Sequence, residues 1–168
     1  MPGGASVMDT RLRRCIRDLA ALEALPSMCV GRSVDEVVEL SLEALPAVLT
    51  SDVLYLSADG IERAVAGRGA PLDAGAAAAL GKIAAAVTAD GGGPAWVDAP
   101  GRGRACVMAA SFPAHAGVGR LLVGRATALD EETDVVLVRT AANLVGSTLE
   151  AARMLEAAQR KDEFLAML

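Results

Sequence analysis

The chain has 168 residues, a formal net charge of −5, and a composition that is 53% apolar but only 2% aromatic. This length suits one domain whose core is built from Ala, Val and Leu rather than from large rings. The acidic balance gives no long-range attraction to nucleic acid or to an anionic membrane, and no segment is apolar enough to span a bilayer.

The first third of the chain predicts two helices. After a disordered tail over residues 1–8, apolar residues at steps of three or four predict an N-terminal helix over residues 9–30. The arginines between them are interpreted as its solvated face. Ser33 followed by Glu36 is a capping-box signature, so a second helix is expected to begin there and to reach Pro46 or a little beyond.

A hairpin and an alanine-rich helix are expected next. Residues 52–57 and 61–66 read as two strands joined by the tight turn at residues 58–60, and the stretch 67–71 reads as a loop. Residues 73–87 follow with helical character but little side-chain bulk. A helix of this composition can approach a sheet closely.

The remaining strands are short or strongly apolar. Residues 95–98 predict a short strand with the single tryptophan, and residues 104–112 are apolar at nearly every position, as in a strand covered on both faces. Pro113 is expected to end that strand, and residues 118–124 form its hairpin partner. Hairpins at both ends of the strand set predict a mainly antiparallel sheet with helices beside it, an α+β fold.

The last helix is unusually long. Asp130 is the expected N-cap, and helical periodicity then continues to Leu168 with Gly146 as its only weak point. Seven-residue spacing favours a left-handed seam between two helices. The seam residues are Leu137, Leu144, Ala151, Ala158 and Leu165 in one row and Thr148 and Leu155 in a second row. An alternative is that the first half of the helix packs on its own sheet and only the second half is free.

Three stretches together resemble a GAF domain. Residues 33–45 resemble the first core helix of that family, residues 112–123 its strand-Pro-turn-Gly-strand hairpin, and residues 129–155 its closing helix. The resemblance covers roughly residues 31–156, and the domain itself is placed at 31–150.

The resemblance implies a five- or six-stranded antiparallel sheet with long terminal helices on one face, where they form a bundle with a second subunit in a homodimer. A small-molecule pocket is implied on the other face, between the sheet and the alanine-rich helix. The larger side chains expected near it are Tyr55, Trp96, Met108 and Phe112. The ligand's identity is left open.

The final residues resemble another module. Residues 161–168, KDEFLAML, are similar to the segment that precedes the phosphoacceptor histidine in sensor histidine kinases. This resemblance implies that residues 151–168 are a signalling helix leading to a kinase domain C-terminal to the chain, in a bacterial two-component phosphorelay. The chain then has no catalytic role of its own.

Other chemistry is disfavoured by the residues present. His115 is the only histidine and lies in an expected turn, so a haem or metal site is not expected. Cys15, Cys29 and Cys106 form no CxxC pair and no Cys-His dipeptide, which disfavours a covalent bilin and favours a reducing cytoplasm. Two alternatives stay open: a ligand-free GAF dimerisation module, and a small GAF enzyme of methionine-sulfoxide-reductase type that uses Cys106.

Overall fold

The sheet contains two hairpins, and the first strand of one pairs with the last strand of the other at the centre of the sheet. The computed structural model describes residues 3–168 of the chain. Its six strands are all antiparallel, in the order β3-β2-β1-β6-β5-β4. Their bounds are β1 Val53–Ala58, β2 Ile61–Ala66, β3 Ala70–Pro71, β4 Ala95–Ala99, β5 Gly103–Ala114 and β6 Gly117–Arg125. The predicted α+β class and the six-stranded antiparallel sheet are thus confirmed.

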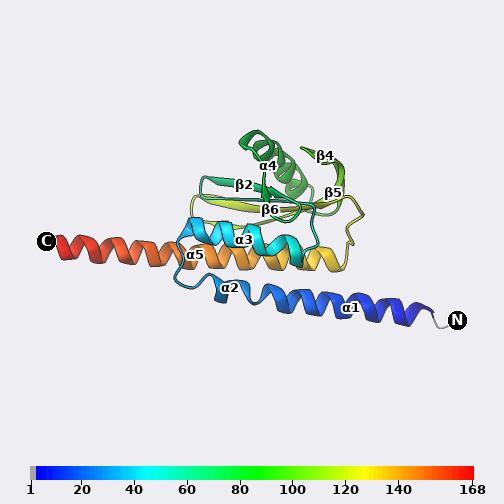
Figure 1. Ribbon diagram of the computed structural model, residues 1–168, viewed down its shortest axis with the longest axis horizontal. Coiled ribbons are helices and arrows are strands. Elements are labelled where there is room, and N and C mark those ends of the chain that lie inside the picture. The colour runs from blue at the N-terminus through cyan, green and yellow to red at the C-terminus, as the bar shows by residue number, and fades with distance from the viewer. Residues whose placement is uncertain (1–2) are drawn as a thin grey trace.

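Helices cover both faces of the sheet unequally (Figure 1). On one face lie α3 (Val34–Val48) and α5 (Thr133–Met167), with α1 (Gly3–Leu22) and the short α2 (Leu25–Met28) beneath α5. On the other face lies α4 (Ala74–Ala89). The helices α1 and α5 run in the same direction, and α5 continues beyond the body of the domain. No helix in the described residues 3–168 is long and apolar enough to cross a membrane.

Alternation along β5 divides the core into two clusters, because successive side chains of a strand point to opposite faces. The larger cluster lies between the sheet and α3, α5 and α1, and it receives Cys106, Met108, Ala110 and Phe112 from β5. The smaller cluster lies under α4 and receives Ala105, Val107 and Ala109. The heavier side chains of β5 therefore face the long helices.

The N-terminal region differs from the expected tail and single helix. The helix α1 already begins at Gly3, within the stretch expected to be a tail, and it ends at Leu22. A separate short helix, α2, follows. Pro26 explains the break, because it has no N–H to donate to the carbonyl of Leu22 and its ring would clash there.

Two strand boundaries also differ. The expected loop at 67–71 contains β3, a two-residue strand that pairs with Val65 and Ala66. Pro113 does not end β5, which continues to Ala114. The pairing of β5 with β4 ends at Val107, so Pro113 has no neighbouring strand on its outer side and its missing N–H removes no ladder bond.

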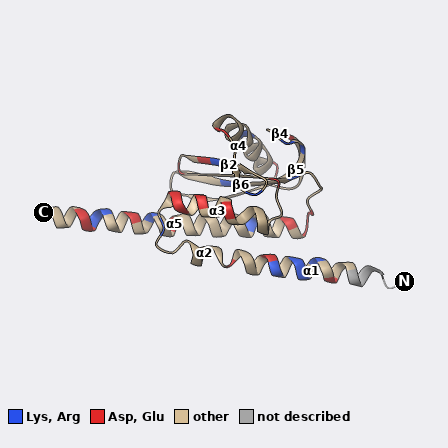
Figure 2. Cartoon of the chain, viewed as in Figure 1, with Lys and Arg blue, Asp and Glu red and all other residues tan. Residues whose placement is uncertain are grey.

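The arginines of α1 are matched by carboxylates (Figure 2). Arg13 pairs with Asp9, and both Arg14 and Arg17 pair with Asp18, which is 5% exposed. Arg11 reaches across to Asp130. The basic appearance of this helix in the sequence is therefore largely offset within the fold.

Candidate functional site

The face under α4 holds Tyr55 in a closely packed position. Tyr55 is 3% exposed, and its hydroxyl donates a hydrogen bond of 2.7 Å to Glu62 Oε1. Burial, reinforced by the Glu62 hydrogen bond, raises the pKa of Tyr55 to about 12. A Cβ on Gly81 of α4 would lie 2.4 Å from Glu62 Oε1 and 2.7 Å from Tyr55 Oη. The helix backbone thus rests almost directly on this pair, as its small side chains allow.

The structure does not bring the other expected pocket residues to Tyr55. Met108 and Phe112 are 1% and 2% exposed and belong to the cluster on the opposite face. Trp96 pairs with Cys106 across β4 and β5, is 49% exposed, and has the Arg104 guanidinium 5.9 Å from its ring centroid. The four side chains were grouped by size without assigning strand faces, and alternation separates them.

The expected seam on α5 is partly covered by the chain itself. Leu137 and Thr148 are 5% and 7% exposed, and Leu144 packs partly against the core. The region of α2 and its following turn lies beside this part of α5, where a hollow of about 250 Å³ is lined by Pro26, Cys29, Val30, Thr148, Ala151 and Leu155. Of the expected seam, Ala151, Leu155, Ala158 and Leu165 remain exposed.

Apolar side chains remain uncovered on the two terminal helices. On α1, Met8, Leu12 and Ile16 follow one another at helical spacing and are 67%, 56% and 58% exposed. On α5, every residue from 157 onward is exposed. The large apolar ones there are Phe164, Leu165, Met167 and Leu168. Exposed apolar surfaces of this kind are typical of regions that bind another protein, a ligand or a membrane.

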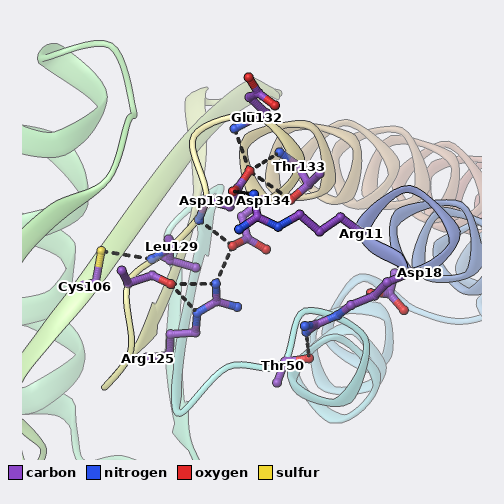
Figure 3. Close-up of polar contacts among 12 residues, drawn as sticks. Arg11, Asp18, Thr50, Cys106, Arg125, Leu129, Asp130, Glu132, Thr133 and Asp134 are labelled. Carbon is purple, nitrogen blue, oxygen red and sulfur yellow. Dashed lines mark hydrogen bonds and ion pairs between the residues drawn. The ribbon is translucent and has the colours of Figure 1, made fainter. Parts of the chain in front are cut away.

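A polar cluster fixes the start of α5 against α1 and β6 (Figure 3). Asp130 Oδ1 accepts hydrogen bonds from Glu132 N–H (2.9 Å), Thr133 N–H (2.8 Å) and the Thr133 hydroxyl (3.1 Å), while Oδ2 pairs with Arg11 at 3.3 Å. Asp130 therefore accepts hydrogen bonds at the start of α5, but the expected N-cap assignment is wrong, because α5 begins at Thr133 and its N-cap is Glu132. Asp134 accepts from Arg125 and from Asp130 N–H. A hollow of about 320 Å³ lies beside these groups.

The cluster around Asp130 should make stability depend on pH. Hydrogen bonds, chiefly from Thr133 N–H, hold the pKa of Asp130 below its usual value. A lowered carboxyl pKa stabilises the fold above the ordinary pKa of about 4, and this contribution fades as pH falls through the folded-state pKa. Asp130→Ala should therefore lower the free energy of unfolding by about 1–2 kcal/mol near neutral pH, and the difference should shrink below about pH 4. Urea denaturation across this pH range measures it.

Asp130→Asn is the matched variant, because its amide oxygen can still accept at the helix start without a charge. Asp130→Asn should lower the free energy of unfolding less than Asp130→Ala does. Its free energy of unfolding should depend less on pH than that of the unmodified protein, because the titrating carboxyl is gone. A gap between Asp130→Ala and the unmodified protein that stays constant down to about pH 3 would contradict the assignment.

The other candidate reactive groups lie apart. His115 lines an open hollow of about 440 Å³ beside α5, together with Asn143 and Glu150. Cys106 is 1% exposed, and its sulfur accepts from Leu129 N–H at 3.4 Å. Among the described residues, no group of three or more His, Cys, Asp or Glu side chains is placed to hold a metal ion.

Two of the ion pairs that sequence reasoning did not predict join different elements of the fold. The first is the pair of Arg125 and Asp134, and the second is an ion pair between Asp59 and Arg153. Asp59 was identified only as a turn residue. The residues of each pair come from different elements, so nothing in the local sequence indicated that they would meet.

Comparisons with known proteins are sparse. No protein-family model matches the chain, and no curated protein matches it by sequence. Among solved structures, the chain is similar to the GAF domain of a "putative sensor histidine kinase" from Pseudomonas syringae pv. tomato. The TM-score is 0.49 and the identity is 20%, over 94% of this chain and 96% of that chain. The described architecture itself, a six-stranded antiparallel sheet with helices on both faces, is of the α+β class.

Proposed function

We propose that the chain is a sensory or regulatory GAF domain that works as a cytoplasmic homodimer and transmits a conformational bias through α5. The observation that carries this proposal is the form of α5. It is a single helix of 35 residues whose first half packs on the sheet and whose residues from 157 onward are all exposed. A continuous helix of this kind can carry a change in the domain to whatever adjoins its far end.

The uncovered apolar residues on α1 and α5 support the dimeric part of the proposal. Leu12 and Ile16 on α1 and Leu155 on α5 are 56%, 58% and 37% exposed, and runs of exposed apolar residues on one helix face are typical of contact surfaces. Pairing these helices with their copies in a second subunit would bury them. A ligand or partner shifts signalling only by binding two arrangements of the paired helices with different affinity.

The kinase part of the proposal rests on residues 161–168, which resemble the lead-in to a phosphoacceptor histidine. The proposal gives the chain itself no catalytic step and places the ATP-dependent chemistry in a domain C-terminal to it. Reading the source gene beyond the codon for Leu168 tests this. A small residue followed by His-Glu-Leu-Arg would support the kinase parent, whereas a stop codon would overturn it.

A second candidate, a ligand-free dimerisation module, is favoured by the packing under α4. The contact of Gly81 with Tyr55 and Glu62 leaves α4 resting directly on the sheet at that point. Native mass spectrometry of freshly purified protein separates the two candidates. A dimer that retains a small molecule supports sensing, a bare dimer supports the ligand-free module, and a monomer at micromolar concentration contradicts both.

The reductase alternative receives no support from the cysteines. Cys15, Cys29 and Cys106 are all buried. Burial is also the main cause that raises the pKa of Cys29, which disfavours its reactive thiolate form. Methionine-sulfoxide turnover that is abolished by Cys106→Ser would restore this alternative.

A further inference from the structure

A single carboxylate joins both hairpins of the sheet to α5. Asp59 lies in the turn between β1 and β2, and its Oδ1 accepts a 2.7 Å hydrogen bond from Ala116 N–H in the turn between β5 and β6. Its Oδ2 forms an ion pair with the guanidinium of Arg153 on α5. Asp59 therefore connects three segments that are far apart in the sequence.

The backbone of the turn holds Asp59 in place. Asp59 and Gly60 have φ values of 54° and 83°, the left-handed pair that a two-residue hairpin turn requires. Asp tolerates this conformation and Gly adopts it freely. The side chain is consequently presented from a rigid turn rather than from a flexible loop.

The ion pair lies where α5 leaves the domain. Ala152 is the last buried residue of α5, and the chain from 157 onward is exposed. The side chains of Asp59 and Arg153 are only 13% and 17% exposed, so their attraction is less screened by solvent than that of a surface pair. Arg153 also pairs with Glu150, but that carboxylate is 48% exposed.

A second contact reaches α5 about one helical turn further along. Val34 N–H at the start of α3 donates a 2.8 Å hydrogen bond to Glu156 Oε1. The exit of α5 is thus held by the sheet through Arg153 and by α3 through Glu156. The sheet contact depends on both hairpin turns keeping their spacing, because they share the same carboxylate.

We infer that Asp59 is a positioning residue that couples the hairpin end of the sheet to the exit of α5. A change that separates the two hairpin turns breaks the contact with Arg153 and frees the helix from that residue onward. This inference rests on the proposed transmitting role of α5 and identifies the connection through which the sheet acts on it.

Asp59→Asn tests the inference in the full chain. Asn suits the same left-handed turn, so the hairpin is retained while the charge is lost. Hydrogen exchange of the backbone amides at 150–160 should become roughly fivefold to tenfold faster, as expected from losing one sheltered charged contact. Exchange in β1 and β6 should stay unchanged. Glu150→Gln is the matched control, because it removes the exposed partner of the same arginine and should have little effect.

A double-mutant cycle distinguishes coupling from general destabilisation. Arg153→Gln should accelerate exchange at 150–160 as Asp59→Asn does, and the double variant should show no further acceleration. Arg153→Lys should restore most of the protection because it keeps the charge.

Unchanged exchange at 150–160 in Asp59→Asn would overturn the inference, as would a uniform acceleration over the whole domain or multiplicative effects in the double variant. Sedimentation of the same samples reports the oligomeric state separately. If the unmodified protein sediments as a monomer, that result counts against the proposed function. The exchange result still decides the role of Asp59.

Discussion

Replacing Phe112 with Ala should lower the free energy of unfolding by about 3–5 kcal/mol, the largest loss expected from a single substitution in this chain. Phe112 is 2% exposed, in a sequence that contains only two phenylalanines. Its ring is enclosed by two glycines: a Cβ on Gly119 of β6 would lie 2.2 Å from the ring, and one on Gly146 of α5 would lie 2.8 Å from it. Urea denaturation followed by far-ultraviolet circular dichroism measures the loss.

Two further variants define the mechanism of that loss. Phe112→Leu keeps an apolar side chain and should cost only roughly 1–2 kcal/mol. Gly146→Ala should destabilise the protein even though Ala is the better helix former, because its methyl group meets the ring. In the Phe112→Ala background the same change at Gly146 should be neutral or stabilising. Equal effects of Gly146→Ala in both backgrounds would contradict the contact.

Changing Leu12 and Ile16 together to Glu should convert the proposed dimer to monomers, with at least a roughly 100-fold increase in the dissociation constant. Both side chains are more than half exposed in the isolated chain, so the charges should be tolerated in the folded monomer. Sedimentation velocity over a range of concentrations measures the change. Leu144 is a poorer choice, because it packs against the core of its own chain and its replacement would also disturb folding.

Val118→Glu is the matched control for the charge substitutions. Val118 is 57% exposed, similar to Leu12 and Ile16, but it lies on β6 rather than on a terminal helix. Its replacement should leave the dissociation constant unchanged. Equal dissociation in the control and in the double variant, or an intact dimer in both, would contradict the assigned interface.

The sequence predicted the elements well where the signal is local. Ser33 and Glu36 do form the capping box, and Asp130 does accept from the first turn of α5. The Asp59-Gly60 turn also lies where the residues place it. In each case a few neighbouring residues determine the geometry, and no distant contact is needed.

The misassignments arose where tertiary contacts decide. Pro113 was expected to end β5, but whether a proline is tolerated depends on whether a neighbouring strand needs its N–H. Met108 and Phe112 were placed near the α4 face because their size was considered without their strand parity. The seven-residue row on α5 is different, because the sequence left two readings open for it. Leu137 is buried within the chain's own core, as expected if the first half of the helix packs on its own sheet, and the intersubunit seam stays a prediction for the exposed part. A periodic apolar row indicates that one face of a helix is covered. It does not indicate whether the chain's own core or a second subunit covers that face.

The common direction of α1 and α5 has a consequence for symmetry. If two copies associate through these helices about a two-fold axis along the bundle, all four helices are parallel. The C-terminal ends of the two α5 helices, one from each subunit, then emerge side by side at one end of the assembly. In such an isologous arrangement each residue near the axis faces its own counterpart. A single substitution there is therefore present twice in one interface, and a change in helix rotation in one subunit is matched by the same change in the other.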